Sequence, residues 1–278
     1  MMLRALQPSD ANEARILWQQ TFHDSDSFLD WFFSNRFTPE WSVGIFNGPE
    51  LVSIVHGLPM PLAIQNEVLP ALMLSGVATV PAYQKQGHMH ACIRYLQQLA
   101  HEKGIDALFN CPQNPGTYDS LGFRPFTAYK RWQGTGEGVP GIIAPFDEEA
   151  AFGVYAGLLD RYTGFALRSR AEFHRKMADY ACDGGQGCML MEQGRAIGYA
   201  IYYMGERLQA VEVLSLGTYA PLLHHLQQLC KGHAIEAKLP PDVPVKGEIV
   251  PQNVLLASPK VWQKIHNSKQ PCFCVDEY

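Results

Sequence analysis

Residues 75–90 place a glycine turn between a strand pattern and a helix pattern. They read Ser75-Gly76-Val77-Ala78-Thr79-Val80-Pro81-Ala82-Tyr83-Gln84-Lys85-Gln86-Gly87-His88-Met89-His90. The free N–H groups of such a turn and the positive end of the helix dipole point at the same place, which favours an anion. Gly87 would let the backbone approach a pyrophosphate closely. The residues alone therefore predict either an anion site or an ordinary structural turn.

A second segment downstream reads Tyr118-Asp119-Ser120-Leu121-Gly122-Phe123. In this order, the two segments resemble the acetyl-CoA loop and the Tyr-x-x-x-Gly-Phe element of the GNAT N-acetyltransferases. Within that family the chain looks most like the enhanced-intracellular-survival (Eis) type, without a full C-terminal sterol-carrier-like domain. That likeness includes residues 28–37 and the Gly-Val-Ala-Thr-Val-Pro strand. It is strong over residues 1–130 and weak beyond them.

The resemblance implies acetyl-CoA as co-substrate and no metal. It places the pantetheine arm along the backbone of Val77, Ala78 and Thr79. It places the pyrophosphate among Lys85, Gln86, Gly87, His88, Met89 and His90. Gln113 and Asn114 lie where relatives touch the far side of the CoA arm, although an ordinary turn between Pro112 and Pro115 is the alternative. Gln84 stands where many relatives have arginine, which leaves Lys85 as the cation of the loop.

Tyr118 is the predicted general acid. A phenol with a pKa near 10 is protonated at neutral pH and can donate to a leaving thiolate; the alternative is a core tyrosine whose hydroxyl caps a carbonyl. Eis-type enzymes use the C-terminal carboxylate near the active site, so the resemblance suggests the Tyr278 carboxylate as base. Asp276 and Glu277 would then attract a cationic acceptor, or the end of the chain is a final strand that meets solvent.

The predicted reaction is direct transfer of an acetyl group from acetyl-CoA to an amine. None of the seven cysteines lies in a nucleophile motif. The acidic tail and net negative charge favour a cationic acceptor, either a small polyamine-like or aminoglycoside-like molecule or a lysine side chain. Two alternatives are a non-catalytic CoA-binding sensor and a scaffold or interaction protein. A homo-oligomer is compatible with all three.

Composition agrees with a globular, cytoplasmic enzyme. The chain has 278 residues, of which 47% are hydrophobic and 18% charged, and its net charge is −5. This charge argues against a basic nucleic-acid-binding face. No stretch approaches the ~20 apolar residues of a membrane span, and the N-terminus lacks the apolar core of a signal peptide. The odd number of scattered cysteines predicts reduced thiols.

The elements predict an α/β (α+β) fold of tandem GNAT-like units, each a mixed twisted sheet flanked by helices. The units span residues 1–132 and 142–278, separated by the glycine-rich residues 133–141. Helices are expected over 9–22, 27–35, 89–103 and 222–230. Strands are expected over 43–46, 51–56, 62–64, 73–80, 106–110, 211–216 and 234–239, with a hairpin over 192–203.

Three smaller expectations concern the second unit, the acceptor pocket and the cap of the second helix. The second unit has no Gln-x-x-Gly turn before its helix, so only the first is expected to bind CoA. Trp31 or Phe32 is expected to line an acceptor pocket because the two cannot easily share one helix face. Asp24 and Asp26 are expected to cap the helix that follows them.

Overall fold

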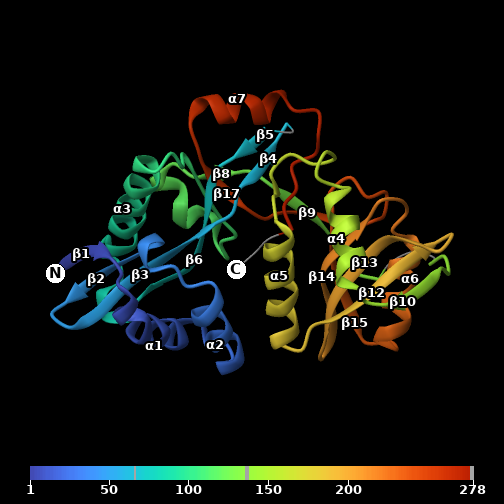
Figure 1. Cartoon of the computed structure of the whole chain (residues 1–278), viewed down its shortest axis with the longest axis horizontal. Helices are drawn as coiled ribbons and strands as arrows, with labels where there is room; N and C mark the ends of the chain where they lie inside the picture. The colour runs from blue at the N-terminus through green and yellow to red at the C-terminus, as the bar shows by residue number, and fades with distance from the viewer. Residues whose placement is uncertain (66, 135–137, 276–278) are drawn as a thin grey trace.

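The computed structural model describes residues 1–65, 67–134 and 138–275 (Figure 1). These residues form two large sheets flanked by helices and a smaller third sheet. The α/β prediction of two sheet-and-helix units is confirmed. The first unit lies at the left of Figure 1 and the second at the right, with α5 (Arg170–Cys182) facing the first unit between them.

The first sheet places a parallel pair of strands at its centre. Its strand order is β1 (Met2–Ala5), β2 (Ser42–Asn47), β3 (Glu50–Pro59), β6 (Ala71–Thr79), β7 (Ala107–Asn110), β17 (Val254–Leu256) and β8 (Arg124–Pro125). β6 and β7 are parallel, and α3 (His88–Glu102) connects them. The predicted strand–helix–strand crossover is confirmed.

Helices cover both faces of this sheet. α3 buries Cys92, Ile93, Leu96 and Ala100 against one face, because these residues recur at helical spacing. α1 (Ala11–Phe22) and α2 (Asp26–Asn35) cover the other face, where Trp18, Leu29 and Phe32 enter the core. Short 3₁₀ helices join the elements, namely η1 (Pro8–Asp10), η2 (Pro39–Trp41), η3 (Pro81–Tyr83) and η4 (Pro115–Leu121).

The second sheet repeats the plan of the first. Its strand order is β10 (Ile142–Pro145), β12 (Gln186–Glu192), β13 (Arg195–Met204), β14 (Arg207–Ser215), β15 (Ala234–Leu239), β9 (Ala128–Trp132) and β16 (Glu248–Pro251). β14 and β15 are its parallel pair, and α6 (Ala220–Cys230) connects them. α4 (Glu148–Ala156) and α5 pack on the opposite face.

The two sheets exchange a strand. β17 comes from the C-terminal part of the chain and pairs with β7 and β8 of the first sheet. β9 comes from the end of the first unit and pairs with β15 and β16 of the second. The predicted boundary between residues 132 and 142 therefore does not separate the sheets. Each sheet contains a strand from the other part of the chain. A single cut in the sequence therefore cannot separate the two sheets.

Further contacts join the units. The small third sheet pairs β11 (Phe165–Ala166) with β4 (Leu62–Ile64), which in turn pairs with β5 (Glu67–Leu69). α2 packs against α5, and Arg36 forms an ion pair with Glu172. α7 (Pro259–Asn267), near the C-terminal end of the described chain, lies above both units in Figure 1. These contacts fix the position of α5 relative to the first sheet.

The remaining element predictions differ in outcome between the units. The predicted helices and strands of the first unit agree with the structure to within a few residues, and so do α6, β14, β15 and the β12–β13 hairpin. The sequence analysis missed α4, α5 and α7. α5 carries many charged residues along its length, and its amphipathic pattern is weak as a result.

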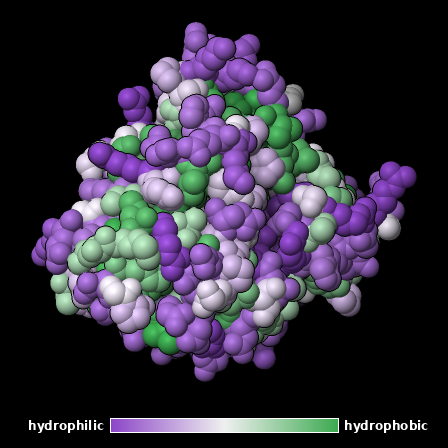
Figure 2. Space-filling model, turned by 60° about the vertical axis from the view of Figure 1, so that its left-hand side comes forward, coloured by the Kyte–Doolittle hydropathy of each residue, from purple (hydrophilic) through white to green (hydrophobic). Residues whose placement is uncertain are grey.

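The surface is mixed in character. The face in Figure 2 is largely hydrophilic, with separate apolar areas among polar groups. Within the described residues, no helix is both long enough and apolar enough to cross a bilayer. All seven cysteines are free thiols.

Candidate active site

Strands β6 and β7 separate at the centre of the first sheet. They pair only from Ala71 to Met73 and from Ala107 to Phe109. Beyond Met73, β6 continues to Thr79, whereas β7 ends at Asn110. In the described chain, the edge of residues 74–79 that faces β7 therefore has no partner strand, and its backbone groups are open to an extended ligand.

A bulge in β6 lies at this opening. The register between β3 and β6 shifts between Ile54 and His56, and Gly76 has a φ of +54°. A Cβ at Gly76 would lie 2.3 Å from the ring of Trp18 and 2.9 Å from His56. Glycine is therefore required here both by the backbone angle and by the close approach of Trp18.

The turn after β6 leads directly into α3. Gly87 is the N-cap of α3 with a φ of +83°, and among the described residues no side chain caps this end. The first N–H groups of α3 therefore remain available for an anion. Nothing lies within 4 Å of the position that a Gly87 Cβ would occupy, so the space above the turn is open.

The two glutamines of the turn hold the loop itself. The side-chain amide of Gln84 donates to the carbonyl of Thr79 at 3.1 Å, and that of Gln86 donates to Ala82 at 3.1 Å. The cation of the loop is Lys85, which is exposed and has a φ of +59°. The side chain of Gln86 is thus engaged within the loop, and its contact with CoA stays a prediction.

A cavity of about 340 Å³ lies over this turn. Its lining includes Val77, Thr79, Lys85, Gly87, His88, Met89 and His90, all predicted cofactor-binding residues, together with Thr21, Tyr83 and Gln84. Ala78 lies elsewhere: it is 2% exposed and packs in the core under α1. The alternation of side chains along β6 explains why Ala78 points away while its neighbours face the cavity.

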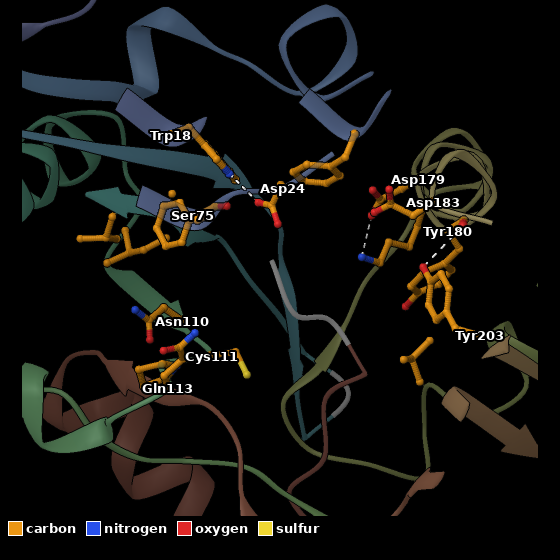
Figure 3. Close-up of a pocket in the computed structure, with 18 of the residues that line it drawn as sticks. Trp18, Asp24, Ser75, Asn110, Cys111, Gln113, Asp179, Tyr180, Asp183 and Tyr203 are labelled. Atoms are coloured by element: carbon orange, nitrogen blue, oxygen red, sulfur yellow. Dashed lines mark hydrogen bonds and ion pairs between the residues drawn. The ribbon is translucent and has the colours of Figure 1, made fainter. Parts of the chain in front are cut away.

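A larger cavity of about 510 Å³ lies between the two units. Figure 3 shows Trp18, Asp24, Ser75 and Asn110 on one side and Asp179, Tyr180, Asp183 and Tyr203 on the other. Leu74, Val77, Cys111, Gln113 and Tyr118 also line it. Val77 lines both cavities, so the two spaces meet at the open edge of β6.

Tyr118 lies on η4 and lines the larger cavity. It is 7% exposed, its ring packs edge-on against Phe123 at 5.5 Å, and its hydroxyl interacts with the side chain of Asn110. Burial raises the pKa of Tyr118 above its ordinary value of 10, so the phenol keeps its proton at neutral pH. His90 of α3 holds η4 nearby through a contact with Ser120 at 3.1 Å.

Carboxylates gather in the larger cavity. Asp24 accepts a hydrogen bond from the indole N–H of Trp18 at 2.7 Å, and Asp183 accepts one from the hydroxyl of Ser25 at 2.6 Å. Asp179 instead pairs with the buried Lys176 at 2.9 Å. In the described part of the chain, Asp24 and Asp183 therefore have neutral donors and keep their charge uncompensated by an ion pair. A positively charged ligand would be stabilised between them.

The remaining predicted residues are Asn114, Gln113 and three residues at the C-terminal end of the sequence. Asn114 is exposed, and its side chain accepts a hydrogen bond from Gly116 N–H at 3.1 Å, as an ordinary turn residue does. Gln113 lines the larger cavity rather than the cavity over the turn. Tyr278, Asp276 and Glu277 lie outside the described residues.

Two of the smaller expectations are wrong. Phe32 is fully buried and Trp31 packs on the same core, so neither lines the larger cavity; Phe28 does. The N-cap of α2 is Ser25, not an aspartate. Sequence reasoning also missed the wall contributed by α5, β13 and β14. Of the cavity residues that the sequence analysis missed, Ser75 had a local signal, because it directly precedes the glycine of the bulge.

The first part of the chain is similar to a known protein family. Residues 2–126 match the protein family described as acetyltransferase (GNAT) domain. A search of curated proteins found no match. Among the described residues, no group of three or more His, Cys, Asp or Glu side chains is placed to hold a metal ion.

Solved structures share the fold over most of the chain. A probable N-acyltransferase from Enterococcus faecalis has a TM-score of 0.73 at 15% identity, covering 91% of this chain and 72% of that one. Eis1 from Mycobacterium abscessus has a TM-score of 0.68 at 16% identity, covering 92% and 74%. Saccharomyces cerevisiae N-myristoyltransferase with bound myristoyl-CoA has a TM-score of 0.62 at 8% identity, covering 92% and 82%.

The fold and the site combine an open strand edge with an uncapped helix N-terminus. More particularly, residues 2–126 match an acetyltransferase (GNAT) domain, which supports an enzyme, an N-acetyltransferase. The neighbouring structures support the fold. The family of this domain binds acetyl-CoA. The predicted likeness to the GNAT family is confirmed for this part of the chain.

Proposed function

We propose that this chain transfers the acetyl group of acetyl-CoA directly to a primary amine. The observation that carries the proposal is the junction at Val77, where the cavity over the Gly87 turn meets the larger cavity that Tyr118 lines. The pyrophosphate would lie on the N–H groups of the turn and α3, and the pantetheine arm along residues 74–79. The thioester would then reach the cavity in which an amine fits.

The chemistry follows from this placement. An ammonium acceptor loses one proton, and its nitrogen attacks the thioester carbonyl carbon to form a C–N bond. The C–S bond breaks, and the CoA sulfur takes a proton from the Tyr118 hydroxyl. The nitrogen then loses a second proton. One of the two amine protons restores the Tyr118 hydroxyl, so the net products are the acetylated amine, CoA thiol and one released proton. The Tyr278 carboxylate remains the predicted base, which would take the proton from the acceptor amine.

The acceptor would be a cationic amine of small-molecule size or a lysine side chain. The larger cavity, about 510 Å³ in volume, suits a small ligand. Asp24 and Asp183 face it from opposite units, and each is held by a neutral donor. Their charge would attract an ammonium group and hold it between the walls.

Within its described residues, the second unit offers no comparable CoA site. Before α6, the N–H groups of Gly217 and Ala220 donate to the hydroxyls of Ser215 and Thr218 at 3.1 and 3.3 Å. Pro221 in the first turn of α6 has no N–H to offer. These contacts support one cofactor site per chain, in the first unit.

The test combines acetyl-CoA binding with acetyl transfer to a library of amines. Gly87→Trp should abolish saturable binding, because the indole fills the open space above the turn. The matched control is Gly194→Trp, at a hairpin glycine with a φ of +77° and nothing within 4 Å. Both variants carry the same backbone penalty, of about 1–2 kcal/mol, but only the first blocks the site.

Tyr118→Phe completes the test. It should keep acetyl-CoA binding and lower turnover by about 10²- to 10⁴-fold. Binding without transfer to any amine in the wild type would favour the CoA sensor. A wild type that binds no acetyl-CoA would contradict both the enzyme and the sensor and leave the scaffold.

A further inference from the structure

A third cavity, of about 430 Å³, lies beside the first sheet and outside the candidate active site. It is bounded by the turn between η4 and β8 and by α7. A volume of this size is in the range of small-molecule sites. Its lining shares no residue with either cavity described above and consists of Gly122, Arg124, Ala257, Pro259, Trp262, Gln263 and His266.

One face of α7 forms a wall of this cavity. The lining residues of α7 follow the spacing i, i+3, i+4 and i+7, which places Pro259, Trp262, Gln263 and His266 on the same side of the helix. The ring centroids of Trp262 and His266 are 5.8 Å apart, with 32° between the ring planes. Trp262 is half-buried and packs on the same core as Phe32. The helix therefore presents a fixed aromatic surface to the cavity.

Arg124 of β8 brings a positive charge to the cavity. Its side chain is exposed and, within the described chain, has no hydrogen bond or ion pair. Lys264 on α7, by contrast, pairs with Glu67 of β5. The guanidinium carbon of Arg124 lies 6.0 Å from the ring centroid of Trp262, at the outer limit of a cation–π contact. The N–H donors of Arg124 are therefore available to a ligand beside Trp262.

The surroundings of the cavity favour an anion. Residues 120–134 and 249–275 contain all of the lining residues and have no Asp or Glu, although the chain as a whole has a net charge of −5. Pro259 begins α7, and among the described residues no side chain caps this end of the helix. The positive end of the helix dipole therefore adds to the charge of Arg124. A bound anion would meet no carboxylate in the lining to repel it.

These side chains select a class of ligand. The guanidinium fork of arginine pairs best with the two oxygens of a carboxylate or phosphate group. An indole ring packs favourably against another aromatic ring. The side-chain amide of Gln263 can donate to or accept from a polar group at the edge of that ring. An aromatic molecule with an acidic group satisfies all three requirements.

We propose that this cavity binds a planar aromatic anion, with its ring on Trp262 and its acidic group on Arg124. The acidic group is a carboxylate on the ring or the phosphate of a nucleotide, since both present paired oxygens to a guanidinium. The site is separate from the one for acetyl-CoA. It does not depend on the proposed acetyl transfer, so the failure of either proposal would leave the other in place.

The test follows the indole N–H signal of Trp262 in ¹⁵N–¹H spectra of the full chain, with Trp262→Phe to identify the signal. CoA is added in excess first, so that a probe does not enter the cavity over the Gly87 turn. Benzoate should shift the Trp262 signal saturably, whereas benzamide, which has the same ring and no charge, should not. Adenosine monophosphate is the nucleotide probe, and tighter binding than that of benzoate would identify a nucleotide as the source of the anion.

Arg124→Gln tests the contribution of the charge. It should weaken benzoate binding about tenfold, the effect of losing a hydrogen bond to a charged group. Because Arg124 is exposed, the fold should be unchanged. The matched control is Arg170→Gln, since Arg170 is also exposed and lies 4.8 Å from the ring centroid of Phe152 in the second unit. This control should leave benzoate binding unchanged.

Three results would overturn the proposal. The first is the absence of a saturable shift of the Trp262 signal with either anion. The second is a shift with benzamide as large as that with benzoate, which would show that the charge is not recognised. The third is an equal loss of benzoate affinity in Arg124→Gln and Arg170→Gln, which would show that the effect of the charge is not local to this cavity.

Discussion

Burial shifts the pKa values of two titratable side chains of the first unit, Tyr118 and His56, in opposite directions. It raises the pKa of Tyr118 and lowers that of His56 to about 3. In both cases the neutral form is favoured, because a charge in an apolar environment loses its hydration. Tyr118 therefore keeps its proton at neutral pH, and His56 stays uncharged in the core.

His56 should make the fold sensitive to acid. Its ordinary pKa of 6.5 applies to the unfolded chain, whereas the folded value is about 3. Between these values the unfolded state binds more protons, so this contribution to stability is present above pH 6.5 and is lost as pH falls towards 3. The loss amounts to about 1.4 kcal/mol per pH unit.

Urea unfolding of the wild type and of His56→Gln from pH 7 down to pH 4 measures this contribution. The difference in free energy of unfolding between the two proteins should fall with that slope, because the carboxylates common to both cancel. A difference that stays constant with pH would show that His56 is not held neutral by burial.

At the scale of elements, the bulge in β6 determines the geometry of the site. It brings Gly76 under the ring of Trp18, and Trp18 in turn holds the carboxylate of Asp24 at 2.7 Å. The strand, the first helix and the acidic wall of the cavity are therefore linked by direct contacts. A shift of the bulge would move the indole and the carboxylate together.

Gly76→Ala should destabilise the protein by about 3 kcal/mol, from the strain of a positive φ and the clash with the Trp18 ring. The matched control is Gly48→Ala, whose φ is +62° but whose Cβ would meet nothing within 4 Å. It should cost only about 1 kcal/mol. Urea denaturation midpoints compare the two, and equal losses would show that the packing of Trp18 on β6 is not under constraint.

The sequence predicted the elements of the first unit well because their signals are local. Cys92, Ile93 and Leu96 recur at helical spacing, and Gly87 marks the helix start. The opposite wall of the cavity was beyond such reasoning. Lys176, Asp179 and Asp183 read as a solvated helix face, and only the packing of α5 against α2 brings them to the site.

At the scale of the whole molecule, the exchange of β9 and β17 makes each sheet depend on the other unit. β17 lies between β7 and β8, so the first sheet cannot be continuous without residues 254–256. This arrangement had no sequence signal, because pairing across more than a hundred residues is decided by closure of the sheet rather than by local pattern. The larger cavity also depends on both units, because each of them contributes one of its walls.

A chain shortened to residues 1–132 should therefore fail to fold, although it contains the GNAT match at residues 2–126. Without β17, the edges of β7 and β8 are unpaired, and β9 has no sheet to join. The full chain should unfold in one cooperative transition, seen by circular dichroism and by tryptophan fluorescence together. A shortened chain with native-like near-ultraviolet circular dichroism and acetyl-CoA binding would contradict this.

The late position of β17 also has a consequence for synthesis on the ribosome. Translation is vectorial, and domains generally fold from the N-terminus as they emerge. Here the nascent first unit has to wait, with a gap between β7 and β8, until Val254 has left the exit tunnel. The first sheet and the larger cavity beside it thus reach their final form only after residues 254–256 have been made.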